Sequence, residues 1–228
     1  MSKKPSTSSR PAAAGPRARR QPKQARSARR REELLAVAGR LLDEIGAEAT
    51  TTTAIAEAAG ASIGTVYEYF PHREALLRAL LDGYRARLRA AVEAALAGAD
   101  PGSWRDAAGR CVDAFVRFYR REPGYRVLWL ESQTTPALRE AGEAWGAEFS
   151  AVIGARLREA APALRPARAR AIARVAVHLI SSLTSLALAG PASQRASTLR
   201  EARAALEAYL ERALNESTAA ATRPRRAR

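Results

Sequence analysis

Hydrophobic residues recur at steps of three and four positions along most of the chain, which is the spacing of one face of an α-helix. The first such stretch runs from about Ser27 to Ile45, and Gly46 is placed to end it with a left-handed residue. Later stretches begin and end at Gly or Pro and lie at about 73–97, 103–122, 125–129, 136–157, 167–189 and 193–214. No stretch alternates apolar and polar residues as a half-buried strand does. The pattern predicts an all-α protein with about nine helices.

Two of the predicted helices are unusually short. One covers about 52–59, where a threonine of A-T-T-T-T-A is placed to cap it and Gly60 ends it. The other covers about 63–69, because Ser62 is placed to cap it and Pro71 disfavours helical geometry at the preceding residue. Two short helices joined by Gly60-Ala61-Ser62 have the form of a helix-turn-helix.

The second short helix is polar where a core helix is apolar. If Val66 points inward, its outer face consists of five residues: Ile63, Gly64, Thr65, Tyr67 and Glu68. Small side chains at the start of a helix let it enter the major groove of DNA, and the hydroxyls of Tyr67 and Tyr69 are long enough to reach phosphates. This face predicts a DNA contact. The alternative is an ordinary helical corner, since a helix–Gly–helix pattern alone is a weak signal.

The full string around this motif is more specific. It reads A-T-T-T-T-A-I-A-E-A-A-G-A-S-I-G-T-V-Y-E-Y-F-P-H-R-E-A-L-L over residues 49–77. It closely resembles the DNA-binding segment of the tetracycline-repressor (TetR) family of bacterial regulators, and the preceding helix fits that family by length and position.

The resemblance implies roles for individual residues. Thr51 and Thr52 correspond to threonines that contact phosphates, and Thr53 falls where some members reach a base. The recognition-helix positions are Ser62, Ile63, Gly64, Thr65 and Tyr67. Tyr69 falls where an aromatic residue contacts the DNA backbone, and Arg73 where a Lys or Arg binds phosphate. His72 departs from the family, which more often has Asn or Asp there; we expect it still to cap a helix and to make DNA binding weakly pH-dependent.

Beyond about Arg78 the resemblance concerns architecture, and it implies a ligand pocket for a small-molecule effector and a homodimer interface. Small and apolar residues of the helix at 167–189 are candidates for the interface, namely Leu179, Ser182, Leu183 and Leu186. Aromatic residues of the middle helices are candidates for the pocket, namely Trp104, Phe115, Phe118, Tyr125, Trp129, Trp145 and Phe149. For both sets the alternative is the ordinary core of one protomer.

The net charge of +15 comes entirely from the two ends of the chain. Residues 1–31 carry 11 Lys and Arg and residues 223–228 carry 4 Arg, with no acidic residue in either segment, so the remainder is neutral. Such basic ends are typically disordered and attract polyanions. The divisions we predict are a disordered basic arm over 1–26, a DNA-binding domain over 27–77, a ligand-binding and dimerisation domain over 78–216, and a disordered basic tail over 217–228.

Several classes of protein are disfavoured by composition. The single cysteine, Cys111, allows no internal disulfide and no paired-cysteine zinc site, and we expect no cofactor and no metal. We expect no membrane-spanning segment, because the most apolar stretch, 175–190, is interrupted by His178 and several serines. The sequence has no nucleophile elbow, phosphate loop or metal-spaced carboxylates, which argues against an enzyme.

These observations favour a cytoplasmic, dimeric transcriptional regulator that binds a double-stranded DNA operator. The resemblance implies that it is a repressor released by an effector. A second interpretation is an architectural protein that coats DNA through its Arg-rich ends, which predicts binding to any sequence with a steep salt dependence.

Overall fold

Nine α-helices and no strand make up residues 20–222, which are the part of the chain that this computed structural model describes. Their bounds are α1 Arg20–Ala49, α2 Thr52–Ala58, α3 Ile63–Tyr69, α4 Arg73–Ala97, α5 Trp104–Arg121, α6 Pro123–Thr134, α7 Pro136–Ala160, α8 Pro166–Ala189 and α9 Ala192–Thr222. The all-α fold predicted from the hydrophobic spacing is therefore confirmed.

The first helix and the last helix are longer than the sequence predicts. Helix α1 begins at Arg20 rather than near Ser27, so the last part of the predicted arm, 20–26, is helical and not disordered. The reason is that Arg, Lys, Gln and Ala favour helix, and Pro22 lies in the first turn, where its missing N–H costs nothing. Helix α9 likewise continues from residue 214 to Thr222 through an alanine-rich segment. The rest of both predicted tails lies outside the described residues.

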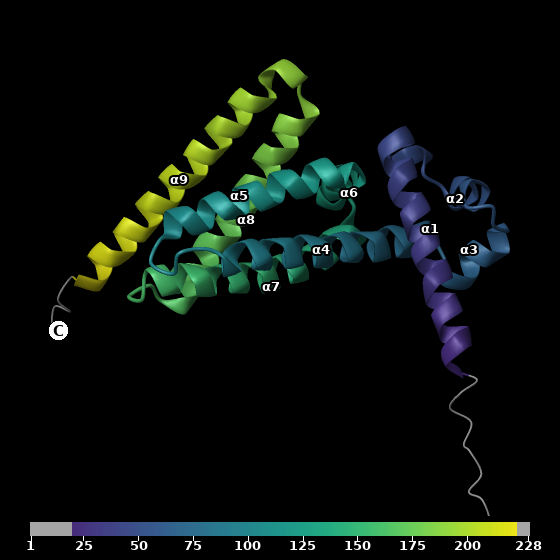
Figure 1. The fold of residues 1–228 in the computed structure, drawn as a ribbon, viewed down its shortest axis with the longest axis horizontal. Coiled ribbons are helices and arrows are strands. Elements are labelled where there is room, and N and C mark those ends of the chain that lie inside the picture. The colour runs from purple at the N-terminus through teal and green to yellow at the C-terminus, as the bar shows by residue number, and fades with distance from the viewer. Residues whose placement is uncertain (1–19, 223–228) are drawn as a thin grey trace, which may run out of the picture.

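Helices α1, α2 and α3 form a small domain at one end of the molecule, and α4 runs from it into the larger domain (Figure 1). The core of the small domain is apolar and comes from all of these helices. Leu34 and Leu42 of α1, Ile55 of α2, Val66 of α3 and Leu76 of α4 are each fully buried in it. This core fixes the orientation of the two short helices relative to α1 and α4.

Gly46 interrupts α1 as the sequence predicts, but the helix does not stop there. Its backbone has φ 78° and ψ 175°, and one further helical turn follows before α2 begins. The buried Thr50 closes this corner, since its hydroxyl donates a 2.6 Å hydrogen bond to the Gly46 carbonyl. The corner sets the position from which α2 starts.

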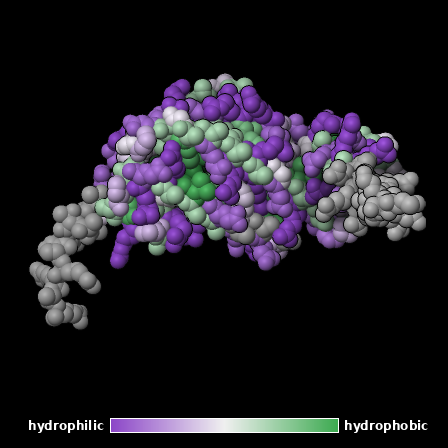
Figure 2. Space-filling view, turned by 60° about the horizontal axis from the view of Figure 1, so that its bottom comes forward, coloured by the Kyte–Doolittle hydropathy of each residue, from purple (hydrophilic) through white to green (hydrophobic). Residues whose placement is uncertain are grey.

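The larger domain consists of α5 to α9 with most of α4. Helix α8 packs against both α7 and α9, and α8 and α9 form a long antiparallel pair that extends beyond the other helices (Figure 1). Hydrophobic side chains gather in the middle of the larger domain and hydrophilic ones surround them (Figure 2). All of the aromatic residues proposed for the ligand pocket lie in this domain.

Helix α8 is the only described helix that is long and apolar enough to span a membrane, by length and composition. The same composition is expected of a helix that is packed on two sides in a water-soluble domain, because such a helix has little polar surface. The most apolar 18-residue window of α8 has a mean hydropathy of 1.6, and 44% of that window is buried inside this chain. The finding is therefore weak evidence for a membrane segment.

Candidate nucleic-acid interface

Helix α2 is held by a cap at one end and a glycine at the other. The Thr51 side chain accepts a 3.1 Å hydrogen bond from the Ala54 N–H, which confirms the predicted threonine cap. At the other end Gly60 has φ 57°, a left-handed conformation that glycine adopts without cost. Ile55 and Ala56 are buried between these ends and anchor α2 to the core of the small domain.

Helix α3 is capped by Ser62, whose hydroxyl accepts a 3.1 Å hydrogen bond from the Thr65 N–H and lies 2.9 Å from the Thr65 hydroxyl. Val66 is fully buried and anchors the helix to the core of the small domain. The C-cap of α3 is Phe70, which precedes Pro71 and has extended backbone geometry as predicted. This short helix is therefore held firmly at both ends.

The outer face of α3 is open to solvent. Ile63 is 41% exposed and Tyr67 is 49% exposed, so two large side chains lie on one open face of a seven-residue helix. Gly64 is also exposed, and a Cβ placed there meets only the Ser62 hydroxyl, at 3.7 Å. The Tyr67 hydroxyl lies 3.4 Å from the Thr52 hydroxyl of α2, so the two short helices present their hydroxyls together. Thr51 and Thr53 are exposed beside them.

Arg73 is half-buried and donates hydrogen bonds to backbone carbonyls of the small domain. Its Nε donates a 2.9 Å hydrogen bond to the Thr50 carbonyl, and its Nη2 donates to the Ala47 carbonyl. These bonds tie the start of α4 to the corner between α1 and α2. Nη1 takes part in neither bond, so the predicted DNA contact of Arg73 stays a prediction alongside this structural role.

Thr50 is a residue of this corner that the sequence analysis does not single out. It stands first among four consecutive threonines, and nothing in the sequence separates a buried member of that run from its exposed neighbours. The difference arises only from the turn at Gly46, which directs the Thr50 side chain into the protein.

His72 caps α4 as predicted, since its Nδ1 accepts a 3.1 Å hydrogen bond from the Ala75 N–H. This bond requires that Nδ1 carry no proton, as in the neutral imidazole. The Glu74 carboxylate lies 3.2 Å from the same nitrogen, and the imidazole is exposed.

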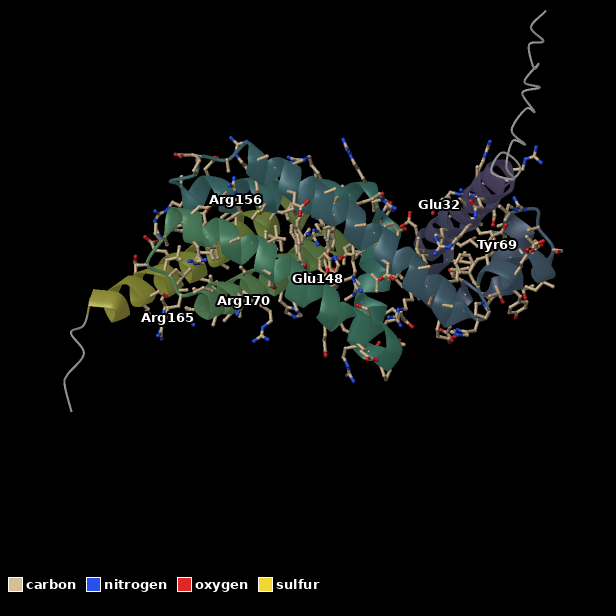
Figure 3. All side chains as sticks on the ribbon, turned by 90° about the horizontal axis from the view of Figure 1, so that it is seen from below. Glu32, Tyr69, Glu148, Arg156, Arg165 and Arg170 are labelled. Atoms are coloured by element: carbon tan, nitrogen blue, oxygen red, sulfur yellow. The ribbon has the colours of Figure 1, made fainter. Side chains whose placement is uncertain are left out.

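The arginines of α1 are partly neutralised within the helix. Arg29 and Arg30 form ion pairs with Glu33, and Arg31 lies 3.6 Å from Glu32. The hydrogen bond from Arg30, followed by that from Arg29, lowers the pKa of Glu33 below its ordinary value. Glu32 and Tyr69 lie at the same end of the molecule (Figure 3). The basic character next to α3 is therefore smaller than the arginine count of the N-terminal segment suggests.

The seven candidate pocket aromatics do not line a single cavity. Trp104 and Phe115 line an apolar cavity of about 50 Å³, together with Cys111 and residues of α4, α7, α8 and α9. Phe118, Tyr125 and Phe149 are buried in the core, and Trp145 stacks on Phe149 at 4.7 Å. The cavity is far smaller than the roughly 300–1,000 Å³ of a typical ligand site.

Trp129, the remaining aromatic candidate, lies away from that cavity. Its ring centre is 6.1 Å from that of His178 on α8. A larger groove of about 810 Å³ lies between α1, α4 and the start of α6, and none of the seven aromatics lines it. Within residues 20–222 no group of His, Cys, Asp and Glu has the arrangement of a metal site.

The four candidate interface residues of α8 lie on a partly open surface. Leu186 is 61% exposed, and Leu179, Ser182 and Leu183 are half-buried. Val175, one turn before Leu179, is also exposed. Other apolar residues of the same helix, such as Ile172, are fully buried in the protomer core. Helix α8 therefore has one apolar face inside the protomer and a second one open to solvent.

Two segments of the chain match known family profiles. Residues 34–80 match the family described as bacterial regulatory proteins, tetR family, and residues 103–210 match the Tetracyclin repressor-like, C-terminal domain. The first segment contains the helix-turn-helix, and the second spans α5 to most of α9. No curated protein matches the chain significantly.

Solved structures give the same result. A TetR-family transcriptional regulator from Streptomyces coelicolor is 27% identical with a TM-score of 0.64, over 81% of this chain and 99% of that one. The TetR family transcriptional regulator PfmR from Thermus thermophilus is 25% identical with a TM-score of 0.57, over 79% and 95%. The multidrug binding protein EbrR, solved as a complex with imidazole, shares the fold at 23% identity and a TM-score of 0.58, over 79% and 94%.

The matches cover both the helix-turn-helix and the helical domain behind it, in the order in which they occur along this chain. Together with the all-α fold and the capped, outward-facing α3, they show that the chain belongs to the TetR family of DNA-binding bacterial transcriptional regulators.

Proposed function

We propose that the protein is a homodimeric repressor that binds a pseudo-palindromic operator in the cytoplasm and is released from it by a small-molecule effector. The DNA-binding domain covers 27–77, the ligand-binding and dimerisation domain covers 78–216, and the boundary between them falls inside α4. We assign no catalytic role to any residue.

The observation that carries the proposal is the outer face of α3. Tyr67 and Ile63 are exposed although both bury well, and the Ser62 cap and Val66 anchor hold the helix in place behind them. A rigid helix whose first turn has small side chains can insert that turn into a major groove. We propose that Ile63, Gly64 and Thr65 face base edges, and that Thr51, Thr52, Tyr67 and Tyr69 contact phosphates.

The open apolar face of α8 supports the dimer. A helix-turn-helix that reads a pseudo-palindrome needs a two-fold axis, and two α3 helices must then lie about 34–36 Å apart. Val175, Leu179 and Leu186 offer an apolar strip of the kind that a second copy covers. We propose that this strip, with Ser182 and Leu183, lies at the two-fold axis.

Release by an effector requires that the ligand favour a spacing of the two α3 helices that no longer matches the groove. The similarity to a multidrug binding protein solved with imidazole supports a small-molecule ligand for the larger domain. The aromatic residues buried there, and the small apolar cavity beside Phe115, give a ligand a place to bind once the helices move apart.

A sequence-selection experiment at about 0.15 M salt tests the proposal, because that ionic strength screens charges beyond about 8 Å. The purified protein is incubated with random duplex DNA, and bound sequences are recovered over several rounds. We expect a pseudo-palindrome with half-sites about one helical turn apart, or a multiple of it. The variant Tyr67→Ala should recover it poorly, and Glu57→Ala, exposed on α2, should recover it as well as the wild type. A featureless pool from the wild type contradicts sequence-specific binding.

The alternative of a DNA coat protein is separated by deleting residues 1–19 and 223–228 together, which leaves every described helix intact. The deletion removes 9 of the 15 Lys and Arg of the two ends, five from the first segment and four from the second. A regulator should keep its sequence preference and lose general affinity. A coat protein should lose most of its binding, together with much of the steep salt dependence that phosphate contacts produce.

A further inference from the structure

Arg85 of α4 is a buried cation in the middle of the larger domain. The residue is 3% exposed, and its guanidinium carbon lies 5.5 Å from the centre of the Trp145 ring on α7. Gly142, one turn before Trp145, leaves the space that the guanidinium needs, since a Cβ at that position would lie 3.0 Å from Nη2. Burial lowers the pKa of Arg85, yet a guanidinium stays protonated in proteins.

This buried charge is only partly paired. Nε and Nη1 are both buried without a hydrogen-bond partner in the described part of the chain. The Asp82 carboxylate is 4.0 Å from Nη1, which is too far for a hydrogen bond, and the Asp82 side chain is 60% exposed. An unpaired buried charge is strongly unfavourable, so a group that pairs with it binds with a corresponding gain.

A further buried polar group lies in the same region. The Tyr119 hydroxyl on α5 is close to Ser181 and Tyr125 but forms no hydrogen bond of normal geometry among residues 20–222. Beside Tyr119 lies Tyr125 of α6, and the two ring centres are 5.1 Å apart. Burial raises the pKa of Tyr125 to about 12, and the positive charge of Arg85 opposes this rise. Polar groups of α4, α5 and α6 thus lie in one buried region.

A row of packed apolar side chains leads away from the guanidinium. Trp145 stacks on Phe149 at 4.7 Å, and Phe149 lies 6.1 Å from Phe115. Phe115 lines the apolar cavity of about 50 Å³, which Arg156 of α7 also lines. Arg156 itself donates to the Leu96 carbonyl and pairs with Glu159, so its charge is already satisfied. Figure 3 shows Arg156 on α7 in the larger domain, well away from Tyr69 in the small one.

We propose that Arg85 binds the anionic head of the effector, and that the effector is an amphipathic organic anion with a carboxylate or phosphate head and an apolar body. The head pairs with the unpartnered N–H groups of Arg85, and the body lies along Trp145, Phe149 and Phe115. That the anion acts as an effector rests on the proposed function, whereas its binding at Arg85 does not.

Thermal unfolding of the purified protein tests the binding directly. The probes are phenylacetate, octanoate and phenyl phosphate, and their neutral counterparts are phenylacetamide, octanamide and phenol at the same concentrations and ionic strength. We expect at least one anion to raise the Tm while its neutral counterpart does not. The carboxylates and the phosphate ester distinguish the two possible heads. Equal shifts from an anion and its neutral counterpart, or no shift from any of the three anions, overturn the proposal.

Two variants locate the site. Arg85→Met removes the charge but keeps much of the length of the side chain, and we expect it to abolish the anion-induced shift while leaving the ligand-free Tm unchanged or higher. The matched control is Arg89→Met on the same helix, whose side chain is 40% exposed and paired with Glu93. It should retain the full response. If Arg85→Met does not fold, Arg85→Lys should show a weaker response than the wild type.

A response that persists in Arg85→Met, or an undiminished response in Arg85→Lys where Arg85→Met does not fold, overturns the assignment. Operator binding is measured separately on the same preparations. If operator binding is absent, the proposed function is contradicted, and the thermal shifts still show whether Arg85 binds an anion.

Discussion

The Nε atom of Arg73, the first residue of α4, donates a 2.9 Å hydrogen bond to the backbone carbonyl of Thr50, 23 positions earlier in the chain. A second nitrogen of the same guanidinium donates to the Ala47 carbonyl. One side chain therefore joins the helix that leads into the larger domain to the corner from which α2 and α3 start. We expect a change in the angle of α4 to move that corner through these bonds.

Replacing Arg73 by Met should destabilise the protein, because two partly buried carbonyls lose their donors. We expect a loss of about 1–3 kcal/mol in the free energy of unfolding, measured by urea denaturation followed by circular dichroism. The exposed Arg78, on the same helix, provides the control: Arg78→Met should change stability by less than about 0.5 kcal/mol. Equal effects from the two variants contradict the structural role of Arg73.

The two glycines with positive φ should differ in their tolerance of a side chain. Nothing lies within 4 Å of a Cβ at Gly46 or Gly60, so the cost of alanine comes from the backbone alone. Gly60 has φ 57°, a left-handed geometry that costs alanine about 1–2 kcal/mol. Gly46 has φ 78° and ψ 175°, a region occupied almost only by glycine, and we expect a cost of up to about 3 kcal/mol.

The matched control for these variants is Gly146→Ala in α7. That glycine also has open space around it but has no positive φ, so alanine should stabilise the helix by about 0.5–1 kcal/mol. The order of stabilities measured by thermal or urea unfolding checks the argument. A Gly46→Ala protein as stable as Gly60→Ala contradicts it.

Sequence reasoning located α2, α3 and their caps because those signals are local. A threonine or serine before a helix, a glycine after it and a proline that follows each act on neighbouring residues, and the structure has Thr51, Gly60 and Ser62 in those roles. The start of α1 was missed because the segment 20–26, rich in Arg and Gln and containing Pro22, reads equally well as part of a basic arm or as the first turns of a helix. The two carbonyl contacts of Arg73 and the missing partners of Arg85 depend on tertiary packing, which no local pattern encodes.

The hydroxyl of Tyr67 should contribute to DNA affinity without contributing to stability. It is exposed, and the protein contact it makes is the 3.4 Å approach to the Thr52 hydroxyl. We expect Tyr67→Phe to weaken operator binding by about 1 kcal/mol, roughly fivefold, and to leave the Tm unchanged. Fluorescence anisotropy with labelled operator measures this. Glu68→Gln is the control on the next residue: removing an acidic group near DNA should leave the affinity equal or higher.

An acidic residue on the open face of α8 should separate the proposed dimer. Leu186→Asp places a charge at a position that is 61% exposed in the protomer, so the fold of one chain should survive. We expect a monomer by light scattering coupled to gel filtration, with operator affinity lower by at least about tenfold, or 1.4 kcal/mol. The control is Ile45→Asp on α1, which is also exposed and belongs to the small domain. A dimeric Leu186→Asp protein places the interface elsewhere.

Cys111 should react slowly with alkylating reagents while the protein is folded. Its thiol lines the small apolar cavity, and burial raises its pKa to about 12, opposed only by the charge of Arg156. The thiolate is the reacting form, so its population at neutral pH falls by about three orders of magnitude relative to an ordinary cysteine of pKa ~8.5. Iodoacetamide labelling followed by mass spectrometry should therefore be slow in buffer and fast in denaturant.

The same shift predicts the pH dependence of stability. The pKa of Cys111 is higher in the folded protein than in the unfolded one. Its stabilising contribution to the free energy of unfolding is therefore fully present below about pH 8.5, where the unfolded thiol also stays protonated. It declines at higher pH and is lost as the pH passes the folded value near 12.

The control for labelling is Cys111→Ser combined with Ala147→Cys, which moves the only thiol to an exposed position on α7. That variant should react quickly when folded; if native Cys111 reacts as fast, the cavity is open to solvent and the burial argument fails.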